Sequence, residues 1–126
     1  MVKGQESVLI GSSNAKKLAS FYEKRVGLKR TFEAEMGEKG EHLYGFDAKG
    51  RSCIYIIDHS KVKGKNKNPE RFILNLEVDT IEKEVKKLLK NKVKLIQKIY
   101  HVEDYGKIAT FEDPEGNYFQ LVQVKA

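Results

Sequence analysis

The sequence predicts an α+β fold in which one β-α-β-β-β unit occurs twice in tandem. Three observations lead to this prediction. In the first half of the chain, strand-like apolar runs surround one amphipathic helical stripe in that order. The second half repeats the same order about 65 residues later. The chain then closes with a turn and a strand of period two, at residues 111–124.

The first repeat is expected to cover about residues 5–58 and to begin with the apolar strand Ser7-Val8-Leu9-Ile10. Ser13 or Asn14 suits the N-cap of a helix that runs to about Arg25. Its apolar stripe and the glycine that ends it have helical spacing: Leu18, Phe21, Tyr22 and Gly27. Three further strands are expected, with turns at 36–40 and 47–50 between them: residues 28–35, 41–46 and 51–58.

A polar linker of about residues 59–70 precedes the second repeat, which is expected over about residues 71–126. Asp79 or Thr80 would begin its helix. The helix stripe consists of Ile81, Val85, Leu88 and Leu89. The strands of this repeat are expected at residues 71–78, 93–100, 105–112 and 118–124. On length alone, residues 1–126 form a single domain.

The composition limits the partners of this chain. Its net charge of +6 makes nucleic acid a candidate, but the basic residues are 20 Lys and only 4 Arg. Arg supplies the planar groups that grip phosphate, and the basic run at 61–68 contains no aromatic residue for base stacking, so the sequence argues against nucleic acid. No apolar run approaches the roughly 20 residues that span a bilayer, so no membrane partner is expected. The single Cys53 fits a reducing compartment, and we expect a cytoplasmic protein.

The closing stretch, Phe111-Glu112-Asp113-Pro114-Glu115-Gly116-Asn117-Tyr118-Phe119-Gln120-Leu121, combines a turn with a strand. Pro114 fixes its own φ, Asp113 can accept hydrogen bonds from the backbone that follows it, and Gly116 accepts a positive φ. Alternation along the strand places Gln120 on the opposite face from Phe119 and Leu121.

This stretch resembles the F-x-D-P-x-G-N-x-x-E-L signature of the glyoxalase/bleomycin resistance protein/dioxygenase (vicinal oxygen chelate) superfamily. The opening segment, from Ser7 through Phe21-Tyr22 to Gly27-Leu28, is similar to that family's first strand and helix. The resemblance implies that each repeat curls into a half-open cup. The two repeats would together form a curved mixed sheet, and paired cups would bind the ligand. In metal-using members the residue at the position of Gln120 is a glutamate ligand.

The resemblance places metal ligands at four positions: Ser7, Ile54, Ile73 (or Leu74, if the register is shifted by one residue) and Gln120. Isoleucine carries no donor atom, and Gln120 alone cannot hold an ion. A shift of one residue would offer Glu6 in place of Ser7, but two aliphatic positions would remain. We therefore expect neither the family's metal centre nor another cofactor, and we identify no catalytic residue.

The preferred hypothesis is a protein that binds or sequesters a small, partly apolar molecule in the cup. Strand alternation predicts these lining residues: Ser7, Leu9, Ile54, Ile56, Asp58, Ile73, Asn75, Tyr118, Gln120 and Val122. One alternative is a metal-dependent lyase or isomerase that resembles glyoxalase I, with a site rearranged from Glu6, Gln120 and a histidine; a dioxygenase-type activity is the other enzymatic alternative. A further alternative is a cup filled by its own side chains.

An open apolar cup also predicts assembly, because soluble monomers rarely expose a large apolar surface. We expect a twofold homodimer of about 29 kDa, twice the 14.5 kDa chain. Ile54 or Ile56 is expected near its interface or the pocket that the interface closes.

Overall fold

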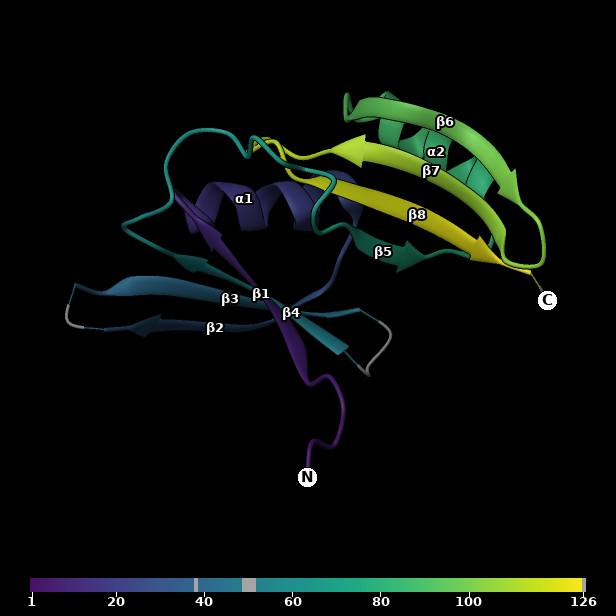
Figure 1. Cartoon of the computed structure of the whole chain (residues 1–126). Coiled ribbons are helices and arrows are strands. Elements are labelled where there is room, and N and C mark those ends of the chain that lie inside the picture. The colour runs from purple at the N-terminus through teal and green to yellow at the C-terminus, as the bar shows by residue number, and fades with distance from the viewer. Residues whose placement is uncertain (38, 49–51, 126) are drawn as a thin grey trace. The chain divides into compact units, whose positions relative to one another are not determined.

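The structure (Figure 1) is a computed structural model that describes residues 1–37, 39–48 and 52–125. Part of each predicted turn at 36–40 and 47–50 therefore lies outside the described residues. The chain forms two compact units, Met1–Gly64 and Lys65–Ala126, and each is described by itself. No helix in the described part of the chain is long and apolar enough to cross a membrane.

The first unit is one β-α-β-β-β module with a mixed four-stranded sheet in the order β1-β4-β3-β2. Strand β1 runs parallel to β4, and the other neighbours are antiparallel. The elements in chain order are β1 (Ser7–Ser12), α1 (Ala15–Phe21), the π-helical turn η1 (Tyr22–Val26), β2 (Arg30–Met36), β3 (Glu41–Ala48) and β4 (Ser52–Asp58).

The second unit repeats this arrangement, with the sheet order β5-β8-β7-β6 and β5 parallel to β8. Its elements are β5 (Leu74–Glu77), α2 (Ile81–Lys90), β6 (Lys94–Val102), β7 (Gly106–Glu112) and β8 (Tyr118–Val124). The predicted element order of both repeats is confirmed.

Helix α1 begins and ends as its residues predict. Asn14 is the N-cap, and its Oδ1 accepts a hydrogen bond from the Lys17 backbone N–H at 3.1 Å. After the π-helical turn, Gly27 adopts a φ of 97°. A side chain rarely tolerates that conformation, so the glycine ends the helix at the expected position.

The last strand of each unit supplies an additional cap to the helix of that unit. Asp58 Oδ1 accepts from the Ala15 N–H at 2.8 Å, and Gln123 Oε1 accepts from the Ile81 N–H at 2.8 Å. The first N–H groups of a helix lack partners within the helix, so these side chains satisfy donors that would otherwise be lost. Thr80, the predicted alternative to Asp79, is the N-cap residue but makes no capping bond with its side chain.

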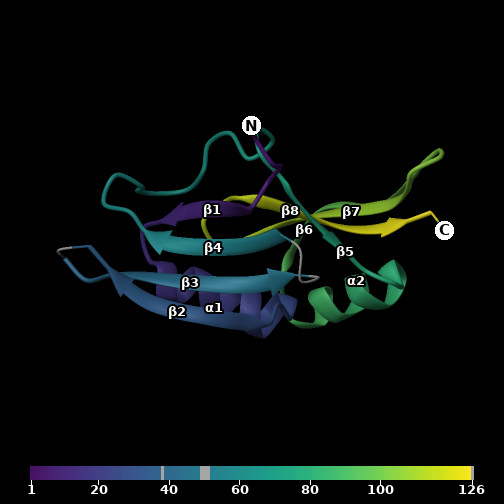
Figure 2. The same ribbon diagram turned by 90° about the horizontal axis from the view of Figure 1, so that it is seen from below.

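These two caps identify the face of each sheet that the helix covers (Figure 2). We call the opposite surface the helix-free face. Buried apolar side chains fill the helix side of each sheet: Tyr44, Phe46, Ile54 and Ile56 in the first unit, and Ala109, Phe111, Phe119 and Leu121 in the second. The helices contribute Leu18, Tyr22, Ile81, Val85 and Leu88. Leu89, expected in the stripe of α2, is instead 46% exposed, because it lies at the margin of the buried stripe.

Candidate functional site

The turn between β7 and β8 is held together by one buried carboxylate. Asp113 is 2% exposed, and its Oδ1 accepts from the backbone N–H groups of Glu115 at 2.9 Å and Asn117 at 3.0 Å. Its Oδ2 accepts from Asn117 Nδ2 at 3.0 Å, and Gly116 takes a φ of 81°. The predicted roles of Asp113 and Gly116 are confirmed. We call residues 113–117 the signature turn; it fixes where β8 begins.

Strand β8 alternates as predicted. Gln120 lies between Asn75 of β5 and Thr110 of β7 on the helix-free face of the second unit. Gln120 Nε2 donates to Thr110 Oγ1 at 3.0 Å. The Asn75 side chain is exposed and forms no hydrogen bond with the described residues. Two amides and a hydroxyl thus form one polar row across three strands.

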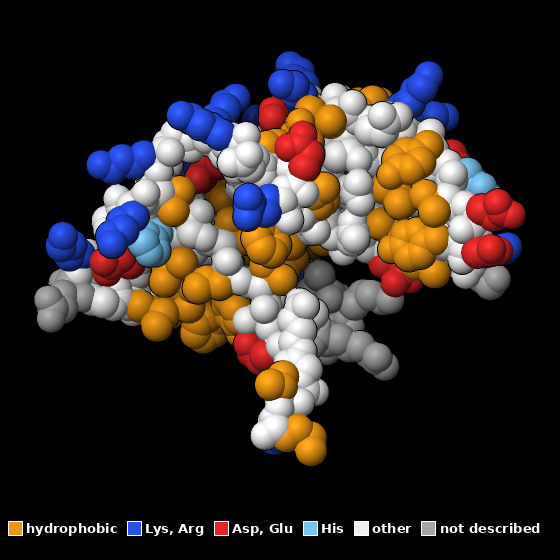
Figure 3. Space-filling view, viewed as in Figure 1, with side chains coloured by type: hydrophobic (Ala, Val, Ile, Leu, Met, Phe, Trp, Pro, Cys, Tyr) orange, Lys and Arg blue, Asp and Glu red, His pale blue; other side chains and the backbone are white. Residues whose placement is uncertain are grey.

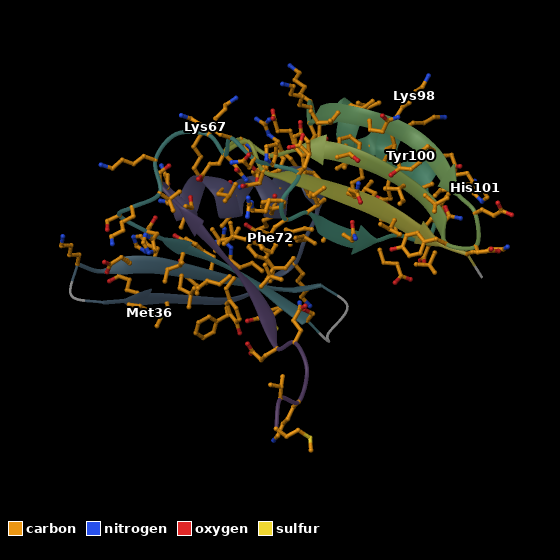
Figure 4. The ribbon with its side chains drawn as sticks, in the orientation of Figure 1. Met36, Lys67, Phe72, Lys98, Tyr100 and His101 are labelled. Atoms are coloured by element: carbon orange, nitrogen blue, oxygen red, sulfur yellow. The ribbon has the colours of Figure 1, made fainter. Side chains whose placement is uncertain are left out.

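Apolar groups flank this polar row. Val122 and Ile108, which are paired neighbours, are 3% and 8% exposed, and Tyr100 of β6 lies opposite Ile108 with 41% of its surface exposed. Figure 4 labels Tyr100 on β6, and Figure 3 shows hydrophobic and uncharged surface side by side over this sheet. Tyr118 is half-buried on the same face. The predicted residues Asn75, Tyr118, Gln120 and Val122 therefore share one face, and Ile73 immediately precedes β5.

The first unit contradicts part of the predicted facing. Ser7 and Leu9 pair with Cys53 and Tyr55 on the helix-free face, whereas Ile54, Ile56 and Asp58 lie on the helix side. Ile54 and Ile56 are 6% and 0% exposed beneath α1, and Asp58 caps that helix, with its Oδ2 also accepting from the His42 N–H at 2.9 Å. The expectation that all five side chains share a face is wrong.

The cause is a shift of one residue between the two repeats. Aligning Gly50 with Gly116 makes Ile54 equivalent to Gln120, but the strand pairs show otherwise. Tyr55 pairs with Leu9 and Gly45, as Gln120 pairs with Asn75 and Thr110. A shift of one residue exchanges every side chain between the two faces of a strand. Gly50 itself lies outside the described residues.

The equivalent row in the first unit is apolar and aromatic. A Cβ atom on Gly45 would lie 2.9 Å from Tyr55 Cε1 and 3.0 Å from Phe32 Cβ, so the missing side chain lets the Tyr55 ring cover this strand. Phe32 and Tyr55 meet edge to face with their centroids 6.5 Å apart. The neighbouring Cys53, with burial as a second cause, raises the pKa of the Tyr55 hydroxyl above its ordinary value.

The sequence matches the profile of the Glyoxalase/Bleomycin resistance protein/Dioxygenase superfamily over residues 4–121. The chain belongs to this superfamily. No match was found among curated proteins.

Solved structures share this fold at low sequence identity. The structure of SMU.1112c superposes with a TM-score of 0.80 at 16% identity, covering 98% of this chain and 100% of that one. TnmS3, an antibiotic binding protein from Streptomyces sp. CB03234, gives a TM-score of 0.77 at 20% identity, with 98% of each chain covered. A superfamily enzyme from Burkholderia phytofirmans PsJN gives 0.70 at 23% identity, covering 95% of this chain and 98% of that one.

The residues of this superfamily member do not fit a divalent metal ion. The two equivalent rows offer Leu9 and Tyr55 in one unit and Asn75 and Gln120 in the other. Neutral amides and a protonated phenol are weak ligands for a divalent ion, and leucine has no donor atom. Within the described residues, no group of three or more His, Cys, Asp or Glu side chains could hold a metal. We therefore derive no chemistry through a metal.

Proposed function

We propose that this superfamily member binds a small, partly apolar organic molecule on the helix-free face of its second unit, and that it sequesters the molecule without transforming it. The contacts are the polar row Asn75–Gln120–Thr110 and the adjacent Val122, with Tyr118 and Ile73 at one margin. Ser7 and Leu9 stay candidate contact residues only on the helix-free face of the first unit itself, and Ile54, Ile56 and Asp58 are withdrawn because they serve the helix side.

The observation that carries this proposal is the polar row beside apolar neighbours, in which Asn75 is exposed, Gln120 is half-buried and Thr110 is buried. Asn75 presents an amide with no partner among the described residues, on the strand next to Gln120 and its hydrogen bond with Thr110. Small-molecule sites combine apolar lining with a few fixed polar groups in this manner. The description of TnmS3 as an antibiotic binding protein supports binding rather than catalysis for a chain of this fold.

The alternative, a metal-dependent lyase, isomerase or dioxygenase, lacks a suitable donor set. Gln120 is neutral and its Nε2 is already engaged with Thr110. Turnover that depends on an added divalent ion, and that disappears in Gln120→Leu, would restore this alternative.

Benzamide is a suitable probe, because it joins an apolar ring to one amide. A fragment of this size binds with a Kd of about 1 mM when its efficiency is ordinary. Saturation-transfer NMR would compare wild type with Gln120→Leu. Loss of one hydrogen bond of about 1 kcal/mol, together with the disturbed row, weakens binding by roughly tenfold.

Gln5→Leu is the matched control. Gln5 and its hydrogen-bond partner Ser52 both belong to the first unit, and their bond is exposed. We expect Gln5→Leu to bind benzamide as wild type does. Equal binding by all three proteins would remove the polar row from the proposal, and absence of any binding would favour a face filled by its own side chains.

We also infer that two chains form a homodimer. Exposed apolar side chains of the first unit support this inference: Leu9 is 62%, Phe32 50% and Met36 49% exposed, all on strands of one sheet. Figure 3 shows hydrophobic side chains gathered beneath β2 and β3, and Figure 4 labels Met36 there. Ile54 and Ile56, expected at such an interface, are buried beneath α1 and are replaced by these three residues.

A further inference from the structure

The linker between the two units is anchored at both ends. We propose that Lys63 and Gly64 form a two-residue hinge, and that Asn66 is a latch that fastens the rest of the linker to the second unit.

On the first side, residues 59–62 belong to the first unit. The His59 N–H donates to the Ser12 carbonyl at 2.9 Å, and the Val62 N–H donates to the His59 carbonyl at 3.0 Å. Val62 also packs against Gly11, because a Cβ atom on that glycine would lie 3.2 Å from Val62 Cγ2. The chain is therefore held in place up to Val62.

On the other side, Asn66 is bound to the signature turn. Its backbone N–H donates to the Glu115 carbonyl at 2.8 Å, and its Nδ2 donates to Asn117 Oδ1 at 3.0 Å. Its Oδ1 accepts from the Asn68 N–H at 2.9 Å, which folds the next residues into a turn. Figure 1 shows the linker passing beside the turn between β7 and β8.

Gly116 makes this close approach possible. A Cβ atom there would lie 3.1 Å from the Asn66 nitrogen and 3.2 Å from Lys65 Cβ. The glycine of the signature turn thus serves two purposes: it adopts a positive φ, and it leaves room for the linker. Lys65 rests on the turn as well, so it belongs to the latched part.

Only Lys63 and Gly64 are left between these anchors. Neither forms a hydrogen bond or ion pair with the described residues. Gly64 has a φ of 68°, and no atom lies within 4 Å of the place where its Cβ would be. Backbone rotation at these two residues breaks no contact within either unit. Few contacts and an unconstrained glycine are the features of a segment that moves at little cost.

Four lysines at alternate positions allow a direct test by trypsin: Lys61, Lys63, Lys65 and Lys67. All four lysines are exposed, so a difference in exposure cannot explain a difference in their cleavage by trypsin. The four sites differ in how firmly the backbone around each is anchored. Figure 4 labels Lys67 on the latched segment. Limited proteolysis of the whole chain, with cleavage sites identified by mass spectrometry, should show the first cut after Lys63.

The Asn66→Ala variant removes the two side-chain bonds of the latch. We expect the rates of cleavage after Lys65 and Lys67 to rise about tenfold, while the rate after Lys61 stays unchanged, because cleavage follows the population of the open segment. Asn68→Ala is the matched control, since the Asn68 side chain forms no hydrogen bond with the described residues. It should give the wild-type pattern.

Equal early cleavage at all four lysines of the wild type would overturn the hinge. An Asn66→Ala pattern identical to that of Asn68→Ala would overturn the latch. Amide hydrogen exchange gives a second measurement on wild type alone: the Asn66 and Asn68 amides should be protected, and the Gly64 amide should not. Protection of Gly64 equal to that of Asn66 would also refute the hinge.

Discussion

Replacing Asp113 by alanine should destabilise the second unit more than any change to a neighbouring surface charge. The carboxylate accepts hydrogen bonds at 2.9, 3.0 and 3.0 Å, and Asp113 is 2% exposed. A hydrogen bond to a charged group contributes about 1.5–3 kcal/mol, so a simple sum exceeds about 4 kcal/mol. Glu115 and Asn117 are only half-buried, so water can satisfy part of what the alanine leaves unpaired. We expect a loss of about 3 kcal/mol.

The Asp113→Asn variant removes the negative charge of the carboxylate but keeps the size and shape of the side chain. The amide keeps an oxygen for the two backbone donors, but its NH2 group faces Asn117 Nδ2, which is also a donor. Turning the Asn117 amide would resolve that conflict and create another one with Asn66 Nδ2. We therefore expect an intermediate loss, about half that of the alanine variant.

Urea unfolding followed by far-ultraviolet circular dichroism measures these changes. With an ordinary denaturant slope, a loss of about 3 kcal/mol lowers the urea midpoint by roughly 1–2 M. Glu112→Ala is the control, because its ion pair with exposed Lys94, at 3.3 Å, contributes no more than about 1 kcal/mol. An Asp113→Ala midpoint no lower than that of Glu112→Ala would refute the reasoning.

Two further predictions concern pH and assembly. Burial is the main cause, and the nearby charge of Glu33 the second, that raises the pKa of Tyr44 above its ordinary value of 10.0. The stability that the protonated Tyr44 contributes is therefore present below pH 10 and is lost as the pH rises through the folded-state pKa. Tyr44→Phe should therefore lose less stability than wild type between pH 7 and pH 11, and an identical loss in urea midpoints would contradict this. For assembly, analytical ultracentrifugation should find about 29 kDa, twice the chain's 14.5 kDa, and Leu9→Lys should shift the mass toward one chain. A wild type that sediments as a single chain would exclude the dimer.

The sequence was most informative where the determining interactions are local. The roles of Asp113 and Gly116 follow from turn chemistry within five residues, and the facing of Gln120 follows from alternation within one strand. The same holds for the helix that begins at Asn14 and ends at Gly27. Local rules of this kind need no knowledge of which strands pair.

Prediction failed where the answer depends on contacts between distant residues. The facing of Ile54 required the register of β4, and a turn glycine outside the pairing is a poor guide to it. The caps from Asp58 and Gln123 join residues 43 and 42 positions apart, so no local pattern signals them. The covering of Gly45 by Tyr55 also arises only once β3 and β4 are paired.

A crystal soaked with 4-bromobenzamide gives the most direct test of the proposed ligand site, because the bromine atom is located by its anomalous scattering. The account predicts density on the helix-free face of the second unit, with the amide of the probe within hydrogen-bond distance of Asn75 or Gln120 and the ring against Val122. The soak uses a millimolar concentration of probe that saturates the protein in solution. Bromine density found only elsewhere, with no density on this face, would contradict the account.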